Sequence, residues 1–196
     1  MGQVLEKEIR ENGAKRYIYK LLPYCGMPAI AAALPAVRAT RAVHSDMLGL
    51  ICGELIIIFG YIVAVGDLKA KRIPNSVLLA MFASWALVIS YQVAVNTEQS
   101  ITPLMDSAAG FVVGGGLFLL VYLISGKGLG GGDVKFMAVA GLYLGLGATI
   151  TVILCGTILA ALTGTVLILL KKIGRKDAIP LAPFLYTGIL LTVFLN

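Results

Sequence analysis

Long apolar segments separated by short polar connections dominate the chain from residue 47 onward. Their lengths approach the roughly 20 residues that a helix needs to cross a bilayer, and they lack the alternation typical of strands. The pattern predicts six helical spans, at about 47–66, 75–95, 105–125, 134–147, 149–170 and 179–195. The link at 145–148 is short enough to form a helical hairpin. No internal repeat is visible, which argues against the duplicated design of many transporters. We therefore expect an all-α, polytopic membrane helix bundle of about six transmembrane helices.

The composition supports a membrane protein. Of the 196 residues, 59% are hydrophobic and only 13% are charged, whereas a soluble domain carries roughly 25% charged residues. Basic loops facing anionic headgroups explain the net charge of +6 better than nucleic-acid binding does. The three cysteines are scattered and His44 is the single histidine, so the sequence supports neither a zinc site nor a disulfide framework.

Basic residues are distributed unevenly among the connections between the spans. The first, third and fifth connections carry nine of them, and the second (around residues 96–100) and fourth carry none. The nine are Lys69, Lys71, Arg72, Lys127, Lys135, Lys171, Lys172, Arg175 and Lys176. By the positive-inside rule, we expect these three connections to face the cytoplasm.

Residues 1–46 form a separate amino-terminal extension, before a membrane domain at 47–196. The extension holds seven of the sixteen basic residues, and prolines interrupt its apolar stretch at 21–37. Such a stretch is a poor span, so we expect an interfacial or re-entrant helix. A signal-like segment is one alternative, and a non-native start is another, because Met47 opens the first clean span.

Two aspartates, Asp67 and Asp133, lie where an apolar segment meets a basic connection on this same predicted face. Charge at membrane depth is costly, which makes each a functional candidate. Two carboxylates that meet can share a proton and activate water for peptide hydrolysis. A simple charged turn is a poor explanation of Asp67, because an acid at a helix carboxyl end opposes the macrodipole. A simple N-cap role for Asp133 leaves unexplained the preceding glycines, which could let a substrate backbone approach closely.

Three motifs give the chain a clear resemblance. They are Asp67 followed by Arg72-Ile73-Pro74-Asn75, then Gly130-Gly131-Gly132-Asp133-Val134-Lys135, then Ile179-Pro180-Leu181-Ala182-Pro183-Phe184. With these motifs the chain resembles bacterial type IV prepilin peptidases, aspartic proteases of the GxGD group, and in particular the short form associated with Flp-type (Tad) pili.

The resemblance implies a site and a substrate. Asp67 and Asp133 would be the catalytic pair, one ionised and one protonated. The residues expected to shape the site or bind substrate are Gly130, Gly131, Gly132, Pro74 and Lys135. No metal or organic cofactor would be needed. The substrates would be pilin-like precursors with a short basic leader and an apolar helix, cleaved at the cytoplasmic face of the cell membrane. Larger members with a cysteine-rich domain also N-methylate the product; this sequence has no CxxC pair and leaves that activity, like the oligomeric state, open.

Two other functions remain as alternatives. An intramembrane protease of the presenilin or signal-peptide-peptidase type would carry a Tyr-Asp pair, whereas Gly66 precedes Asp67. A small proton-coupled transporter would need polar residues near the middle of several spans, and these are nearly absent. Among the other polar or small residues, we expect Asp106 to cap the third span, Lys135 to anchor at headgroups and the glycines at 114–116 to permit close helix packing.

Overall fold

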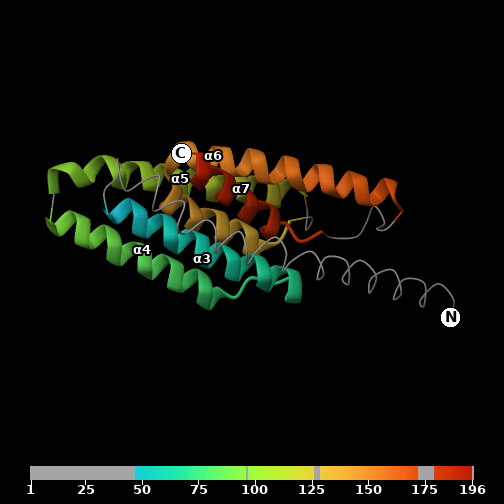
Figure 1. Cartoon of the computed structure of the whole chain (residues 1–196), viewed down its shortest axis with the longest axis horizontal. Helices are drawn as coiled ribbons and strands as arrows, with labels where there is room; N and C mark the ends of the chain where they lie inside the picture. The colour runs from blue at the N-terminus through green and yellow to red at the C-terminus, as the bar shows by residue number, and fades with distance from the viewer. Residues whose placement is uncertain (1–46, 96, 126–128, 172–178, 196) are drawn as a thin grey trace.

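The structure, a computed structural model, describes residues 47–95, 97–125, 129–171 and 179–195. The regular structure within these ranges is entirely helical. It consists of α3 (Met47–Ala70), α4 (Asn75–Val95), α5 (Thr97–Ser125), α6 (Gly131–Leu169) and α7 (Ala182–Leu195). The helices lie side by side in an elongated bundle (Figure 1). The prediction of an all-α membrane bundle is confirmed, whereas the predicted extension at 1–46 lies outside the described residues.

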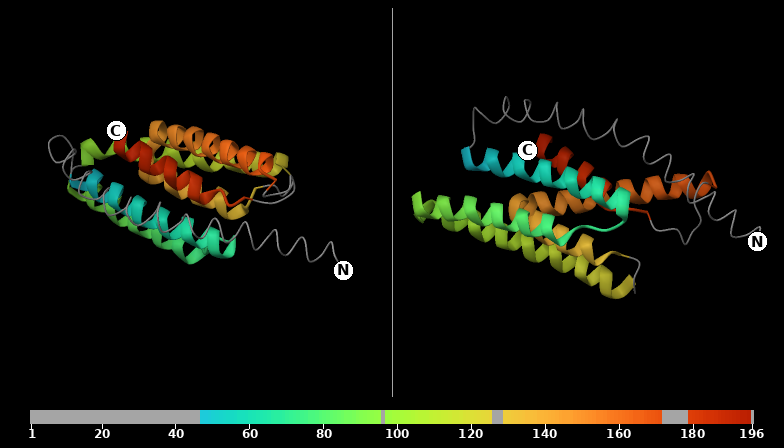
Figure 2. Two further views of the ribbon diagram at one scale, coloured as in Figure 1. Left: turned by 45° about the vertical axis from the view of Figure 1, so that its right-hand side comes forward. Right: turned by 90° about the horizontal axis from the view of Figure 1, so that it is seen from below.

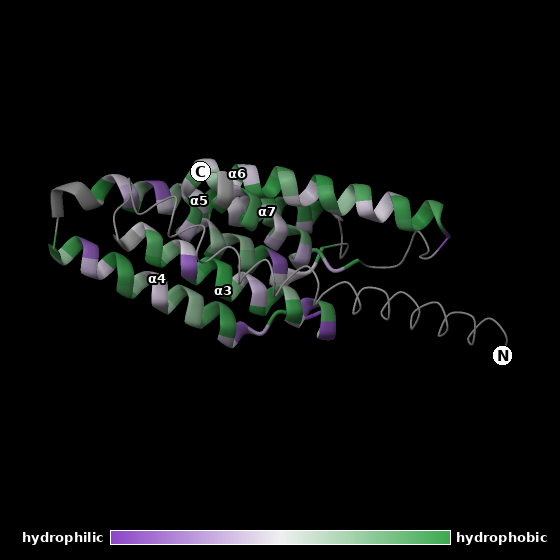
Figure 3. Cartoon of the chain, in the orientation of Figure 1, coloured by the Kyte–Doolittle hydropathy of each residue, from purple (hydrophilic) through white to green (hydrophobic). Residues whose placement is uncertain are grey.

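Four helices within the described ranges are long and apolar enough to cross a membrane, namely α3, α4, α5 and α6. Helix α7 is apolar but has only 14 residues. The predicted count of six spans is therefore not confirmed. The outward faces of the helices are mostly apolar (Figure 3), as expected of surfaces in contact with lipid.

Helix α6 contains both the fourth and the fifth predicted spans. Its backbone leaves the helical conformation at Gly145, where φ is 72° and ψ is −178°. The two halves of α6 run in opposite directions on either side of this point (Figures 1 and 2). A positive φ of this kind is accessible to glycine at little cost. The structure therefore confirms the helical hairpin predicted at this link.

Asp106 holds this hairpin rather than capping its own helix. Helix α5 begins at Thr97, so Asp106 lies well inside it, and the Asp106 Oδ1 accepts a hydrogen bond from the Leu146 N–H at 3.0 Å. The carboxylate thus satisfies an amide at the start of the second half of α6, as an N-cap would. Our expectation that Asp106 caps the third span was wrong, because the polar residues that we assigned to a loop form the first turn of α5.

Glycines let α5 approach the first half of α6 closely. A Cβ added at Gly114 would lie 2.6 Å from the Met137 carbonyl oxygen, and one added at Gly115 would lie 2.8 Å from the Ala138 Cβ. A Cβ added at Gly116 would meet nothing within 4 Å. The predicted role in close packing is therefore confirmed for Gly114 and Gly115 and not for Gly116. Small residues at such contacts allow helices in a membrane to gain van der Waals energy.

Helix α4 is joined to α6 by a polar contact away from the helix ends. The Tyr143 hydroxyl donates to the Met81 carbonyl oxygen at 2.5 Å and lies 2.8 Å from the Ser84 Oγ. Polar side chains in an apolar environment need such partners, so this contact fixes α4 against the first half of α6.

One end of the bundle gathers the segments that carry the sequence motifs. The end of α3 and the starts of α4, α6 and α7 all lie there (Figures 1 and 2). Helix α3 continues to Ala70, three residues beyond Asp67, and α6 begins at Gly131, two residues before Asp133. Both aspartates therefore belong to terminal helical turns rather than to the loops next to them.

Candidate active site

Asp67 lies in the last turn of α3 and is only 7% exposed. Its Oδ2 accepts a hydrogen bond from the backbone N–H of Ala182, the first residue of α7, at 3.2 Å. The first amides of a helix have no partner within the helix, and this end of the helix carries a partial positive charge. The start of α7 thus compensates for the unfavourable position of a carboxylate at the end of α3.

The segment that follows Asp67 turns sharply into α4. Lys71 adopts a left-handed conformation with φ of 50°, and its N–H donates to the Asp67 carbonyl oxygen at 2.7 Å. A left-handed residue of this kind is a common way to end a helix. The Lys71 ammonium also lies near enough to attract the Asp67 carboxylate. The turn therefore brings a cation beside the candidate catalytic group.

Pro74 completes this turn and starts the next helix. Its carbonyl oxygen accepts the Val77 N–H at 3.1 Å, and its Cδ would lie 3.8 Å from a Cβ added at Gly66. Proline fixes its own φ and lacks an N–H, both of which suit the residue before a helix. The predicted site-shaping residue Pro74 thus lies beside the residue that precedes Asp67.

Asp133 lies in the first turn of α6 and is 9% exposed. The N-cap of α6 is Gly130, so Asp133 is not itself the cap. Its carboxylate accepts a hydrogen bond from the Gly130 backbone, and its Oδ1 is buried without a hydrogen-bond partner among the described residues. One oxygen of this carboxylate is therefore held by the Gly130 backbone, whereas the other is buried without such a contact.

The three glycines before Asp133 have different surroundings. A Cβ added at Gly130 would lie 2.9 Å from the Asp133 Oδ2, and one added at Gly132 would lie 3.2 Å from the Ile73 Cβ. A Cβ added at Gly131 would meet nothing within 4 Å. Packing within the protein thus accounts for Gly130 and Gly132, whereas only Gly131 has open space beside it.

The structure brings Asp67 and Asp133 together. Their carboxylates are close enough that a negative charge on one opposes a negative charge on the other. Two neighbouring carboxylates that share one proton have a lower electrostatic energy than two that are both ionised. The ionised member can then act as a general base and the protonated member as a general acid. Hydrolysis of a peptide bond by an activated water molecule is the chemistry that suits this arrangement.

Lys135 lies at the edge of the site and is exposed. Its Nζ donates to the Asn75 Oδ1 at 3.2 Å and so joins α6 to the start of α4. We expected Lys135 either to shape the site or to anchor at headgroups, and the contact with Asn75 places it close to the site. Sequence reasoning missed Asn75, Ile73 and Ala182 as contributors, although all three belong to the quoted motifs.

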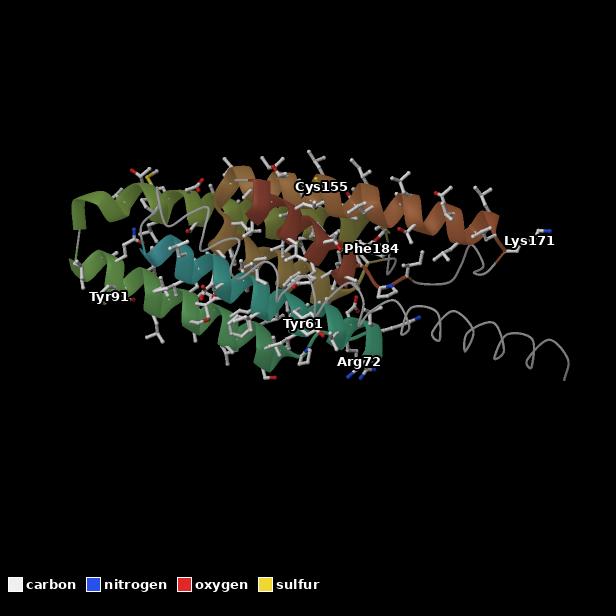
Figure 4. The ribbon with its side chains drawn as sticks, in the orientation of Figure 1. Tyr61, Arg72, Tyr91, Cys155, Lys171 and Phe184 are labelled. Atoms are coloured by element: carbon white, nitrogen blue, oxygen red, sulfur yellow. The ribbon has the colours of Figure 1, made fainter. Side chains whose placement is uncertain are left out.

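The described residues offer no obvious metal site. Within the described ranges, no group of three or more His, Cys, Asp or Glu side chains is arranged to hold a metal ion. Cys52 and Cys155 are free thiols on α3 and α6, and Figure 4 labels Cys155 on the upper side of the bundle. The carboxylate pair is thus the strongest candidate for catalysis that the described residues contain.

Comparison with known families places this site in context. The model of the type IV leader peptidase family matches residues 54–168, which is more than half of the chain and contains both aspartates. No solved structure matches the chain significantly.

Individual relatives are similar over the same region. A prepilin leader peptidase/N-methyltransferase of Bacillus subtilis is 32% identical over 133 residues, which are 66% of this chain and 50% of that protein. Proteins of the same name from Aeromonas salmonicida and Stutzerimonas stutzeri are 35% identical over 124 residues and 26% identical over 120 residues. Each of these two matches covers 61% of this chain and 40% of the relative. The chain thus spans half or less of the length of these curated relatives.

Proposed function

The chain belongs to the type IV leader peptidase family, and from this membership we propose that it is a membrane-embedded aspartic endopeptidase that removes the short basic leader of type IV pilin-like precursors. The membership confirms the resemblance drawn from the three motifs. It also favours a peptidase over a proton-coupled transporter and over a protease of the presenilin type.

One observation carries the proposal. Two buried carboxylates, from the end of α3 and the start of α6, lie near enough to oppose each other's charge. Burying two negative charges side by side costs free energy unless a metal ion or a basic group neutralises each of them. A buried pair of this kind is therefore typical of a functional site. The proposed use is a shared proton.

The proposed reaction follows from that proton. The ionised carboxylate removes a proton from a bound water molecule, whose oxygen attacks the carbonyl carbon of the scissile peptide. The protonated carboxylate donates to the carbonyl oxygen as negative charge develops there. The tetrahedral intermediate then collapses: the C–N bond breaks, a proton passes to the leaving amine, and the other product retains a new carboxyl group. The Asp133 Oδ1, which is buried and lacks a partner among the described residues, is suited to contact the water or the carbonyl. Because the pair acts as a unit, we do not assign the base to one member.

The proposed substrate and location follow from the surroundings of the pair. The basic residues Lys71 and Arg72 lie directly after α3, and Lys171 lies just beyond the end of α6, at the same end of the bundle as Arg72 (Figure 4). By the positive-inside rule this end faces the cytoplasm, where the leader of a precursor would meet the site while its apolar helix stays in the bilayer. The proposed enzyme is therefore a multi-pass protein of the cytoplasmic membrane.

Aspartate-to-asparagine variants test the proposal. Asp67→Asn and Asp133→Asn should each lower cleavage of a pilin-like precursor in membranes by at least about a hundredfold, because asparagine cannot transfer a proton. The double variant should lose little more than either single variant, since residues that act as a unit fail together. Asp106→Asn is the matched control: its amide oxygen can still accept from Leu146, and it should cleave like the parent protein. Wild-type cleavage by either dyad variant would refute the proposal.

A further inference from the structure

The connection between α3 and α4, together with the first residue of α4, contacts the start of α6 on both sides of Asp133 in the sequence. This connection starts at Lys71 and leads from the helix that carries Asp67 to Asn75, the first residue of α4. Its two contacts join it to Gly132 and to Lys135. The segment that follows one aspartate is therefore attached to the segment that carries the other.

The first contact is a fit between Ile73 and Gly132. A Cβ added at Gly132 would lie 3.2 Å from the Ile73 Cβ, 3.4 Å from its Cγ1 and 3.5 Å from its Cδ1. Ile73 is half-buried and packs against the hydrophobic core. Its side chain thus occupies the space that a side chain at residue 132 would need. Because the Ile73 Cβ is tied directly to the backbone, relief of this contact requires the connection to shift by a few tenths of an ångström.

The second contact lies on the other side of Asp133. The Lys135 ammonium donates to the Asn75 side-chain oxygen at 3.2 Å. An exposed hydrogen bond of this kind contributes modestly to stability, but its geometry limits how far α4 can move from α6. With the Tyr143–Ser84 contact further along the same two helices, it holds the start of α4 in place.

We propose that Ile73 and Asn75 are positioning residues, which through Gly132 and Lys135 set the separation of Asp67 and Asp133. The proposal rests on the proposed function, since this separation matters for catalysis only if the two aspartates act together. Catalytic groups must be held to within about 0.5 Å of their working geometry. A displacement of a few tenths of an ångström uses up most of this tolerance, so we expect it to lower the rate. On this view Gly132 serves the packing of Ile73 rather than the approach of a substrate.

A disulfide tests the contact without any measurement of activity. In a protein whose native cysteines are replaced, Ile73→Cys with Gly132→Cys should crosslink on mild oxidation, because the two Cβ atoms would lie about 3.2 Å apart, near the range of disulfides. The matched control pairs Ile73→Cys with Gly131→Cys, since a Cβ at Gly131 would have no atom within 4 Å. Thiol labelling under reducing and non-reducing conditions measures both. If the two cysteine pairs crosslinked equally, or if the Ile73→Cys/Gly132→Cys pair did not crosslink, the contact between residues 73 and 132 would be refuted.

Cleavage by the crosslinked protein then tests the positioning role. If the contact holds the working geometry, the oxidised Ile73→Cys/Gly132→Cys protein should cleave precursor about as fast as its reduced form. Loss of cleavage on oxidation, restored by reduction, would instead show that the connection must leave α6 during the reaction, and would overturn the role.

Single variants separate positioning from general stability. Gly132→Ala should lower kcat roughly tenfold with little change in KM, and adding Ile73→Ala should restore part of the loss. Gly116→Ala, where a Cβ meets nothing within 4 Å, should leave kcat unchanged. Asn75→Ala should lower kcat, and Asn75→Asp should preserve it because a carboxylate still accepts from Lys135. The proposal would be overturned if the variants lost folded protein to the same extent as they lost kcat, and if adding Ile73→Ala to Gly132→Ala restored none of the activity.

The outcomes also separate this inference from the proposed function. If Asp67→Asn retains cleavage while the Ile73/Gly132 pair crosslinks selectively, then the proposed chemistry fails and the contact stands. If the aspartate variants are inactive while the glycine and asparagine variants cleave normally, then the chemistry stands and the positioning role fails.

Discussion

The backbone N–H of Ala182 donates to the Oδ2 of Asp67 at 3.2 Å, across 115 residues of sequence. The donor belongs to the first residue of α7 and the acceptor to the last turn of α3. The Asp67 carboxylate lies at the carboxyl terminus of α3, where the helix dipole disfavours a negative charge. The amino terminus of α7, which favours a negative charge, faces it. The contact explains how the fold tolerates Asp67 at this position, and it gives the third sequence motif a physical role.

Removal of this donor should impair the site. Ala182→Pro deletes the N–H at a helix position where proline is tolerated, so we expect a folded protein with cleavage reduced about 10- to 100-fold, the range for a hydrogen bond to a charged group. Ala182→Gly keeps the N–H and serves as the control. Cleavage rates in membranes, with detergent-extracted yield as the measure of folding, provide the comparison. Full activity in Ala182→Pro would show that the contact is dispensable.

The dyad should give cleavage a bell-shaped dependence on pH. At low pH both carboxylates are protonated and no base remains, whereas at high pH both are ionised and no acid remains. We therefore expect kcat/KM to fall on both sides of an optimum, by up to about tenfold per pH unit on each limb. Rates measured with detergent-solubilised enzyme, where both faces share one pH, would reveal the profile. A rate independent of pH across acidic and alkaline buffers would contradict a shared proton.

The hairpin in α6 should depend on Gly145. Gly145→Ala forces a residue with a Cβ into a positive-φ, extended conformation that is essentially restricted to glycine, which costs about 2 kcal/mol, and that Cβ would collide with the Asp106 carboxylate. We expect the melting temperature in detergent to fall by roughly 2–8 °C. Gly147→Ala is the control, because a Cβ there meets nothing within 4 Å. Equal stability of the two variants would argue against the turn at Gly145.

Labelling should place the dyad end of the bundle in the cytoplasm. With native cysteines replaced, single cysteines at Arg72 and Lys171 should be shielded from an impermeant thiol reagent in intact cells and labelled after lysis. Both side chains are exposed at the end of the bundle that carries the aspartates (Figure 4). A cysteine at Val95, which is 57% exposed at the end of α4 away from the dyad, should be labelled in intact cells. Labelling of the first two from outside would invert the proposed orientation.

The amino-acid sequence by itself determined the helical bundle, the hairpin and the candidate pair. Apolar runs near bilayer length specify helices because backbone groups in lipid must be satisfied within the segment. The short link at 145–148 between two apolar runs marked the reversal of α6, and the structure then placed the positive φ of that reversal at Gly145. Asp67 and Asp133 stood out because charge is rare and costly in such segments. Each of these conclusions depends on local composition or spacing, which a sequence displays directly.

Only the tertiary structure decided which groups meet. In the folded structure the Asp67 carboxylate accepts a hydrogen bond from the first amide of α7, and the Asp106 carboxylate accepts one from Leu146. Ile73 packs into the space that a side chain at Gly132 would fill. These contacts join segments far apart in the chain, and they depend on distances that hydropathy and motif spacing do not encode. The start of α5 was misplaced for a related reason, because polar residues suit the first turn of a helix as well as they suit a loop. The packing of helices, rather than the pattern within any one of them, builds the site.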